Sequence, residues 1–267
     1  MWIYDTAIYF FFYGILGWCT EVAFAAVMER RFVNRGFLNG PICPIYGVGV
    51  AAVVSLLKPL ENQLLLLYLA SALLVTLLEG LTGYVLDRLF HHKWWDYSGM
   101  PFNIGGYVCP LFSLLWGTAC VLIVKVVHPM VQELCGRLPL AAGALLLSVC
   151  SVGLAADVIV TVNDIMRWNR QLDAMEKIAA ELRELYGKMG ENIYENVMDT
   201  IELREKLDVA VGEQKTRIAQ LKEKYSELAQ RSIRSGRRFM RAFPKLQSRR
   251  HKELLEQIRC RLRNEKK

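Results

Sequence analysis

The sequence has 267 residues, of which 53% are hydrophobic, and its mean hydropathy is +0.22. These values exclude an ordinary soluble domain. Its 33 basic and 26 acidic residues give a formal charge of +7 and concentrate from about Arg167 onward. We therefore expect a transmembrane domain over residues 1–166, a cytoplasmic helical or coiled-coil segment over 167–230, and a basic amphipathic tail over 231–267.

Long apolar runs dominate the first part of the chain. They cover residues 6–28, 42–57, 64–86, 106–127 and 140–163. About 20 apolar residues are needed for a helix to cross a bilayer, and most of these runs reach that length. The second run is the shortest and the richest in Gly and Pro. The pattern predicts an all-α polytopic membrane protein with about five transmembrane helices.

The connections between these runs carry Lys and Arg unevenly. With five spans, the turn that holds Arg30, Arg31 and Arg35 lies on the same side as the turn that holds Arg88. The charged extension lies on that side too, and Lys and Arg are enriched on the cytoplasmic side of membrane proteins. We therefore expect a multi-pass protein of the cell membrane, with its N-terminus outside and its C-terminus in the cytoplasm.

A sequence motif occurs twice within the apolar half. EVAFAAVMER begins at Glu21 and EGLTGYVLDR begins at Glu79, and each ends with an acid followed by Arg. After each come a turn, an asparagine (Asn39 or Asn103), and a Cys-Pro followed by an aliphatic and an aromatic residue. The order of these features predicts two parallel repeats of a helix pair. The fifth span has no counterpart.

Glu21, Glu79 and Asp157 all lie inside apolar runs. At about 1.5 Å per residue, each is roughly 13–15 Å from a nearby cytoplasmic Arg, so the three share a similar depth. A charged side chain there costs on the order of 3 kcal/mol, so the acids must face protein, water or one another.

Three interpretations of these acids remain open. The carboxylates line a polar cavity that binds a cation, protons or a polar substrate group; they form interhelical hydrogen bonds that specify packing; or they pair with arginines of the neighbouring repeat. The cavity interpretation predicts a substrate-binding set of Glu21, Glu79 and Asp157. Asn39 and Asn103 join this set, because the Gly- and Pro-rich segments after them would line the route.

The sequence carries little that predicts other chemistry. The seven cysteines include no pair with zinc-ligand spacing, and adjacent His91 and His92 are expected in water or at the headgroups. The chain also lacks a nucleophile elbow and a phosphate-binding glycine motif. We expect no enzyme activity, no cofactor and no metal, and no hydrolysis of ATP by this chain.

The segment after the last apolar run has apolar residues at steps of three and four, which is typical of a helical seam. They are Leu172, Met175, Ala179, Leu182, Tyr186, Met189 and Ile193, followed after a break by Val211, Ile218, Leu221, Tyr225 and Leu228. A coiled coil between chains and a helical hairpin within one chain both fit this pattern. We expect a homo-oligomer.

The tail is strongly basic. Residues 231–267 hold 14 Lys and Arg and 3 acids, which gives a local charge of +11. Apolar Phe239, Met240, Phe243 and Leu246 alternate with basic residues. Anionic membrane lipids are the partner that this pattern favours beneath a membrane domain. RNA, an acidic protein and a solvated tail are the alternatives, and we do not expect nucleic acid.

Several of these segments resemble a bacterial family of ABC-transporter type IV, or CmpB-like, permeases. The resemblance covers roughly residues 8–125, and its most specific part is RGFLNGPICPIYGVG, which begins at Arg35. It implies a membrane-spanning permease that needs a separate ATP-hydrolysing subunit. That subunit would dock at the turns that carry Arg30, Arg31, Arg35 and Arg88.

The expected function is therefore that of a transport permease with an acidic intramembrane site. A membrane-tethered scaffold or sensor, with a cytoplasmic coiled-coil module, is the alternative. An intramembrane enzyme comes third, because the acids have no partner nucleophile or metal cluster in the sequence.

Overall fold

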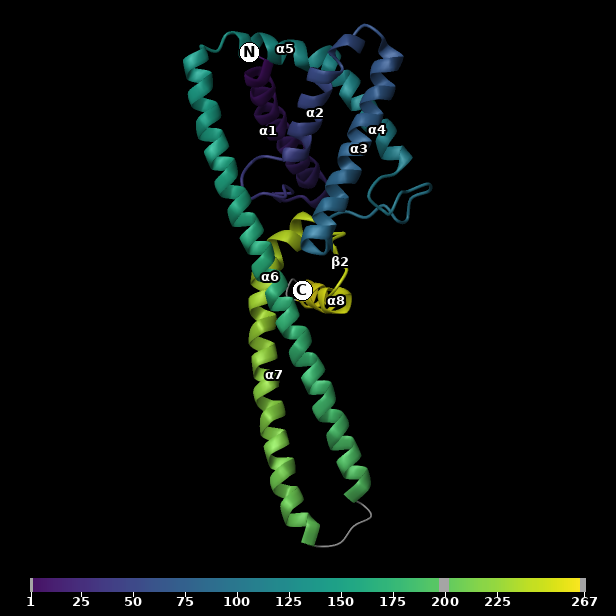
Figure 1. Ribbon diagram of the computed structural model, residues 1–267, viewed down its shortest axis with the longest axis vertical. Coiled ribbons are helices and arrows are strands. Elements are labelled where there is room, and N and C mark those ends of the chain that lie inside the picture. The colour runs from purple at the N-terminus through teal and green to yellow at the C-terminus, as the bar shows by residue number, and fades with distance from the viewer. Residues whose placement is uncertain (1, 197–201, 265–267) are drawn as a thin grey trace. The chain divides into compact units, whose positions relative to one another are not determined.

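The chain is built from helices and divides into two units. A computed structural model describes residues 2–196 and 202–264, with side chains described over 2–187, 212 and 214–260 (Figure 1). The first unit, here called the membrane unit, contains residues 1–163 and 239–249. The second, here called the hairpin unit, contains residues 164–238 and 250–267. Residues 239–249 thus join the apolar half rather than the rest of the basic tail.

The elements of the membrane unit follow the chain from the N-terminus. They are α1 (Trp2–Glu29), α2 (Pro44–Leu56), the 3-10 helix η1 (Lys58–Leu60), α3 (Leu64–Phe90), β1 (His92–Lys93), α4 (Pro110–Leu122), the π-helix η2 (Ile123–Val127), α5 (His128–Gly136) and the first part of α6 (Leu140–Asn196). The end of α7 (Glu202–Ala242) and strand β2 (Gln247–Ser248) complete it.

Among the described residues, four helices are long and apolar enough to cross a membrane: α1, α3, the combined helix Pro110–Gly136, and the first part of α6. The expected fifth span, residues 42–57, forms only the 13-residue α2. A helix of that length extends about 20 Å, less than the roughly 30 Å of the hydrocarbon core. The helix starts at Pro44 because proline suits the first helical position, where no backbone donor is needed, while Pro41 interrupts regular hydrogen bonding in the segment before it.

Segment 30–43 nevertheless brings the chain back along α1. The backbone N–H of Cys43 donates to the carbonyl of Gly14 at 2.9 Å, halfway along α1. At the other end of α2, the hydroxyls of Ser55 and Thr6 lie 3.2 Å apart. An irregular segment and a short helix together therefore return the chain to the level at which α1 begins. Backbone groups that proline and glycine leave free are satisfied here by protein, as a membrane interior requires.

The turns after α1 and α3 lie beside each other. Phe37 in the first turn contacts Trp94 in the second, with ring centroids 4.9 Å apart, and its ring is 6.1 Å from that of Phe90 at the end of α3. The two turns therefore lie on the same side of the membrane unit, the arrangement that the repeat predicts.

The core of the membrane unit lies between α1, α2, α3 and the bent helix α4–η2–α5. It includes Tyr13, Val53, Leu67, Cys120 and Val131, all buried. Figure 1 shows that α5 turns away from the direction of α4. The π-helix and Pro129 at the first turn of α5 explain the bend, because both interrupt regular helical hydrogen bonding.

In the hairpin unit, the second part of α6 packs against α7. Trp168 is fully buried, and its indole N–H donates to the hydroxyl of Ser232 at 3.0 Å. Gly236 leaves room for that indole, because a methyl group there would overlap the Trp168 ring. Arg217 pairs with Glu181 at 2.8 Å further along the two helices. Helix α8 (Lys252–Asn264) completes the unit.

The helical seam differs in part from the predicted one. In the hairpin unit, the buried residues described on α6 are Ile165, Trp168, Leu172, Met175 and Ile178. Ile178 thus takes the place expected for Ala179, and Tyr186 is exposed. On α7, Ile218 and Leu221 are buried as expected. The predicted seam residues 189, 193 and 211 lie outside the described side chains. The seam is buried by a hairpin within one chain, which is one of the two arrangements that the spacing allows.

The apolar residues of the basic tail are also placed differently from the expectation. Phe239, Met240 and Leu246, which the sequence analysis assigned to a basic amphipathic tail, are buried in the membrane unit. The reason is local, because the turns after α1 and α3 supply aromatic surface for them. Trp94 packs against Phe239 with ring centroids 5.7 Å apart.

Candidate functional site

Glu21 on α1 is half-buried against α2. The hydroxyl of Tyr46, in the first turn of α2, donates to Glu21 Oε1 at 2.6 Å. This contact requires close packing of the two helices, which Gly17 provides one turn before Glu21. A methyl group at residue 17 would lie 2.5 Å from Tyr46 Cβ. Gly17 on α1 thus lets a tyrosine hydroxyl of α2 reach the Glu21 carboxylate.

Glu79 on α3 is the more deeply buried acid, with 7% of its surface exposed. The hydroxyl of Tyr97, on the loop formed by residues 91–109, donates to Glu79 Oε1 at 3.1 Å. The indole of Trp116 on α4 also lies beside this carboxylate. Even so, Glu79 Oε2 is buried and accepts no hydrogen bond of good geometry from any described residue. One oxygen of a buried carboxylate is therefore left without a clear partner.

The two repeats supply the hydroxyl in different ways. Tyr46 is the aromatic residue of the first Cys-Pro motif, and the equivalent residue of the second is Phe112, which has no hydroxyl. Tyr97 stacks on Phe112, with ring centroids 4.8 Å apart and an interplanar angle of 20°. A loop residue thus delivers to Glu79 the group that a helix residue delivers to Glu21.

The two glutamates belong to one connected cluster. Tyr46, the donor to Glu21, contacts the ring of Trp116, the neighbour of Glu79, with centroids 5.9 Å apart. We call Glu21, Tyr46, Glu79, Tyr97 and Trp116 the glutamate cluster. Residues from both repeats meet in it.

Asp157 on α6 has a separate environment. Its carboxylate accepts hydrogen bonds from the backbone N–H of Asn39 at 3.0 Å, from the Asn39 side-chain amide at 3.0 Å and from the backbone N–H of Gly40 at 2.7 Å. The hydroxyl of Thr161 adds a weaker donor at 3.3 Å. The structure thus brings together the predicted pair Asp157 and Asn39, but not with the glutamates. A carboxylate satisfied in this way fastens segment 30–43 to α6.

Asn103, the counterpart of Asn39 in the repeat, forms its described side-chain hydrogen bonds within its own loop. Its amide donates to the carbonyls of Met100 at 2.8 Å and Ser98 at 3.3 Å, and its oxygen accepts from the backbone N–H of Gly106 at 3.0 Å. Asn103 therefore shapes loop 91–109, whereas Asn39 holds an acid on another helix. The two asparagines occupy equivalent positions in the repeat, but they form different contacts.

The arginines predicted to receive a partner are placed in or near the turns. Arg31 pairs with Glu29 at 2.5 Å, and Arg88 donates to the hydroxyl of Tyr84 at 3.2 Å. Arg35 donates to the carbonyl of Ala242 at 3.4 Å, so a segment of the same chain meets this turn. Arg30 is exposed, with a φ of 51° just past the end of α1.

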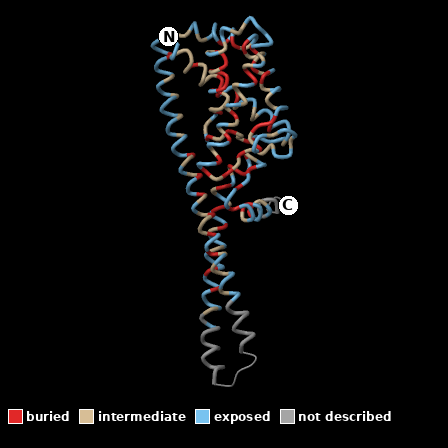
Figure 2. The backbone as a smooth tube through the Cα atoms, turned by 45° about the vertical axis from the view of Figure 1, so that its right-hand side comes forward, coloured by how far each residue is buried: buried red, intermediate tan, exposed pale blue. Residues whose placement is uncertain are grey.

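An open cavity of about 740 Å³ lies between α1 and α6, and the acids do not line it. Its walls are almost entirely apolar, with Thr6 and Ser151 as the polar exceptions. The part of α6 that contributes to it is largely exposed, as the pale blue colour in Figure 2 shows. In a bilayer such a surface faces acyl chains or another apolar helix, so this cavity and the glutamate cluster are distinct features.

The sequence did not indicate which residues surround the two glutamates, namely Tyr46, Tyr97 and Trp116. Tyr46 stands in the most specific motif of the resemblance, yet nothing in that motif identifies the acid that it reaches. Tyr97 and Trp116 lie 18 and 37 positions beyond Glu79 and carry no spacing signal. The only available indication was chemical, because a carboxylate inside an apolar helix needs nearby hydroxyl or indole donors.

These features define an all-α polytopic membrane protein with carboxylates held inside its helical core. A comparison with protein families identifies the family to which the chain belongs. The model of the family described as Putative ABC-transporter type IV matches residues 8–162, more than half of the chain, and the chain belongs to this family. Neither a curated protein nor a solved structure matches it.

Proposed function

We propose that the chain is the membrane-spanning permease subunit of an ABC-type transporter, with the glutamate cluster as its binding site. The family supports the transporter class. The observation that carries the site is Glu79, which is buried but leaves Oε2 without a hydrogen-bond partner of good geometry among the described residues. A buried polar atom in that condition destabilises the protein unless a ligand or a proton satisfies it, so such a residue persists where function requires it.

The chemistry of the cluster indicates the class of ligand. Two carboxylates together with tyrosine hydroxyls and an indole favour a proton, a cation or a positively charged group of a substrate. The sequence contains no phosphate-binding glycine motif, so the proposal includes a separate ATP-hydrolysing subunit. That subunit would dock at the turns after α1 and α3, where Arg30 and Arg31 are exposed.

The proposal includes an arrangement in the membrane. It places the chain in the bacterial inner membrane, with the N-terminus outside and the C-terminus in the cytoplasm. The basic turns and the basic extension support this orientation. Segment 30–56 would complete five passages, four by long helices and one by an irregular segment with α2. A homo-oligomer is part of the proposal, because the first part of α6 leaves most of its apolar surface uncovered (Figure 2). Lipid headgroups remain the proposed partner of the exposed basic residues in the tail.

The test compares Glu79→Gln with the wild-type chain in liposomes that contain a trapped pH-sensitive dye. Removing the carboxylate should abolish proton flux, because the amide cannot exchange a proton, while the helical content should stay unchanged. Glu133→Gln is the matched control, since Glu133 is exposed and pairs with Arg137 one helical turn away. Equal flux in the Glu79 variant and the wild type would remove the cluster from the proposal.

The second candidate function is a membrane-tethered scaffold or sensor. The observation that favours it is the hairpin unit, which buries its own seam and offers a helical module for partners, including a coiled coil with another chain. Copurification from native membranes separates the candidates. Recovery of a subunit with a phosphate-binding glycine loop supports the permease, and consistent recovery of other proteins through the hairpin unit supports the scaffold.

A further inference from the structure

Residues 239–249, here called the strap, pack against the turn after α3. The ring of Trp94, which is almost fully buried, lies 5.7 Å from that of Phe239 and 5.0 Å from that of Phe243. Phe37 contacts Trp94 from the turn after α1. These aromatic contacts bury the apolar residues of the strap within the membrane unit and fix where it runs.

Beyond the aromatic contacts the strap forms a short antiparallel strand pair. His92 and Lys93 of β1 pair with Ser248 and Gln247 of β2, respectively. The backbone N–H of Arg249 extends the pairing by donating to the carbonyl of His91 at 3.0 Å. The strand pair sets the register of the strap, so it determines where the side chains of residues 247 and 249 can reach.

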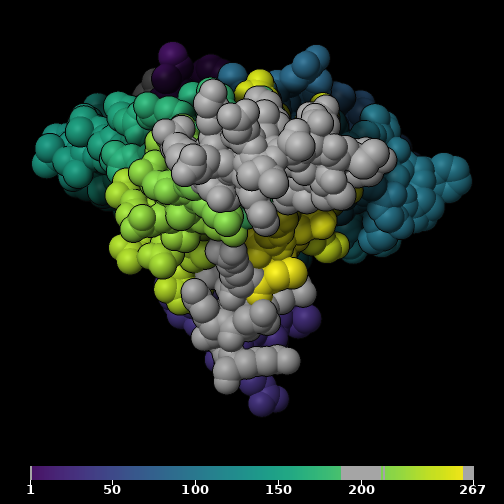
Figure 3. Space-filling view, turned by 90° about the horizontal axis from the view of Figure 1, so that it is seen from below, coloured from purple at the N-terminus to yellow at the C-terminus, as the bar shows by residue number. Residues whose placement is uncertain are grey.

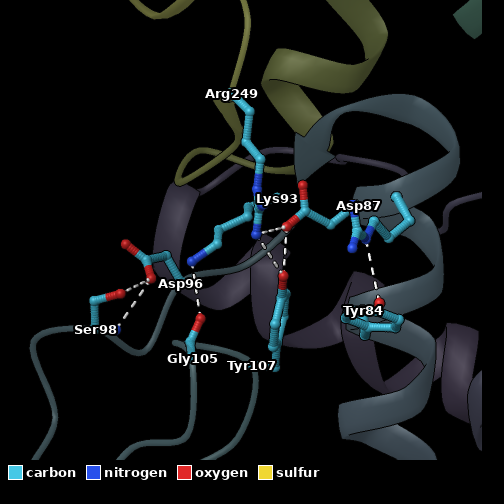
Figure 4. A network of polar contacts seen from close by, with 9 residues as sticks. Tyr84, Asp87, Lys93, Asp96, Ser98, Gly105, Tyr107 and Arg249 are labelled. Atoms are coloured by element: carbon cyan, nitrogen blue, oxygen red, sulfur yellow. Dashed lines mark hydrogen bonds and ion pairs between the residues drawn. The ribbon is translucent and has the colours of Figure 1, made fainter.

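Arg249 then reaches a buried acid. Its guanidinium lies 2.7 Å from Asp87 Oδ2 and donates to the hydroxyl of Tyr107 at 2.8 Å, and Tyr107 donates to the same carboxylate oxygen (Figure 4). The side chain of Asp87 is only 1% exposed. The Arg249 side chain is 53% exposed, so only the acid of this ion pair is buried. The loss of Arg249 would leave that buried carboxylate with Tyr107 as its donor among the described residues.

Gln247 makes a second contact with the same loop. Its side-chain amide donates to Asp96 Oδ2 at 2.9 Å, while Asp96 Oδ1 accepts from the backbone N–H of Ser98 at 3.0 Å. Desolvation alone would raise the pKa of Asp96, but the hydrogen bonds from Ser98 and Gln247 and the charge of Lys93 hold that pKa below its ordinary value. The carboxylate therefore stays ionised and available to the strap.

Both contacts flank the residue that binds Glu79. Asp96 immediately precedes Tyr97, and the backbone N–H of Tyr97 donates to the carbonyl of Gly106 at 2.9 Å, next to Tyr107. Loop 91–109 thus runs out and back, and the strap holds it at one point on each side of Tyr97. Its tip carries exposed Phe102 and projects at the edge of the membrane unit (blue-teal, right-hand side of Figure 3).

We propose that Arg249 is a positioning residue for the glutamate cluster: through Asp87 and Tyr107 it holds loop 91–109 so that Tyr97 donates to Glu79. The inference rests on the proposed function only in treating the glutamate cluster as a binding site. The positioning of Tyr97 is argued from the contacts of Arg249, Asp87 and Tyr107 alone. It makes Glu79 responsive to the strap, whereas Glu21 takes its hydrogen bond from a helix that the strap does not touch in any described contact.

The test measures how fast a hydrophobic carbodiimide labels Glu79 in the full chain, reconstituted in liposomes and quantified by peptide mass spectrometry. Arg249→Ala should raise the rate about fivefold, the equilibrium effect of losing one ordinary hydrogen bond to the carboxylate. Arg249→Lys keeps a charge beside Asp87 and should restore a slower rate. Labelling of Glu21 is the internal control, because general loosening of the fold would raise both rates.

Two further comparisons assign the effect to Tyr97. Tyr97→Phe should raise Glu79 labelling directly, and Arg249→Ala should then add nothing in that background. Gln247→Ala, which removes an exposed side chain and leaves the ion pair intact, should give a smaller increase. Arg250→Ala is the matched control, since this exposed neighbour lies outside the membrane unit.

Three results would overturn the inference: unchanged labelling in Arg249→Ala, equal acceleration at Glu21, or a full additional effect of Arg249→Ala beside Tyr97→Phe. None of them involves transport, so the positioning role stands or fails separately from the permease proposal. If Glu79→Gln leaves flux unaffected while the labelling pattern holds, the cluster is not the transport site but Arg249 still positions Tyr97.

Discussion

Glu21 takes its hydrogen bond from a helix, whereas Glu79 takes its hydrogen bond from a loop. Tyr46 is fixed in the first turn of α2, at 2.6 Å from Glu21. Tyr97 stands 3.1 Å from Glu79 on loop 91–109, and contacts elsewhere in the molecule determine where that loop lies. Residues that position loop 91–109 can therefore change the hydrogen bond to Glu79, whereas the hydrogen bond to Glu21 does not depend on that loop.

Removal of the donor hydroxyls tests this difference at the scale of single residues. Tyr46→Phe should lower stability in detergent micelles by about 0.6–1.7 kcal/mol, the range for interhelical hydrogen bonds in membranes. Tyr97→Phe should cost less, because its hydrogen bond is longer and originates from a loop. Tyr84→Phe is the control, since the Tyr84 hydroxyl meets only the exposed Arg88 among the described residues. Equal melting temperatures for the Tyr46 and Tyr84 variants would contradict the expectation.

The acids were visible in the sequence, but their donors were not. A carboxylate in an apolar run is evident from composition alone, and the duplicated motif indicates that Glu21 and Glu79 share a depth. Tyr97 could not be assigned, because its reach depends on the path of an irregular loop. Asp157 was grouped with the glutamates by depth, which says nothing about the direction in which a side chain leaves its helix.

At the scale of elements, glycines decide how closely α1 and α2 approach each other. Gly17 faces Tyr46, and Gly47 faces the backbone of Phe10, where a methyl group would lie 2.5 Å from the carbonyl oxygen. Such contacts take the place of a hydrophobic driving force, which is absent between helices in lipid. Without them the tyrosine of α2 could not reach Glu21.

Two glycine substitutions should therefore have opposite effects. Gly17→Ala should destabilise the protein by about 1–3 kcal/mol, because the added methyl group overlaps Tyr46. Gly49→Ala on α2 meets nothing within 4 Å. It should be neutral or stabilising by up to about 1 kcal/mol through helix propensity. Thermal melting in detergent measures both, and a Gly17 variant as stable as the Gly49 variant would show that the helices are not closely packed there.

Element boundaries were predictable where local chemistry sets them. The prolines at residues 41 and 44 indicate a broken segment, and α2 indeed begins at Pro44. The length of that helix was overestimated, because an apolar run does not distinguish a spanning helix from an irregular segment packed on α1. The Ile178 seam position was missed for a related reason, since burial depends on the partner helix and not only on spacing.

At the scale of the whole chain, the order of segments in the sequence does not tell which structural unit each segment joins. Residues 239–249 lie between the two sequence segments of the hairpin unit yet belong to the membrane unit. Arg249 and Tyr107 are 142 positions apart, and no periodicity or motif links them. A basic residue among aromatic ones fits a lipid-facing tail equally well, so only the fold could distinguish the two.

This placement changes how a truncation must be interpreted. A chain that ends after Arg170 loses the hairpin unit and the strap together, so lost activity would not by itself favour the scaffold. We expect that truncation to lower the melting temperature of the membrane unit, because Asp87 loses its ion pair. A synthetic peptide of residues 237–250, added in trans, should restore part of the loss. The same peptide with Arg249→Ala should restore less, since only the aromatic contacts remain. Equal rescue by both peptides would show that Arg249 contributes nothing to the docking of the strap.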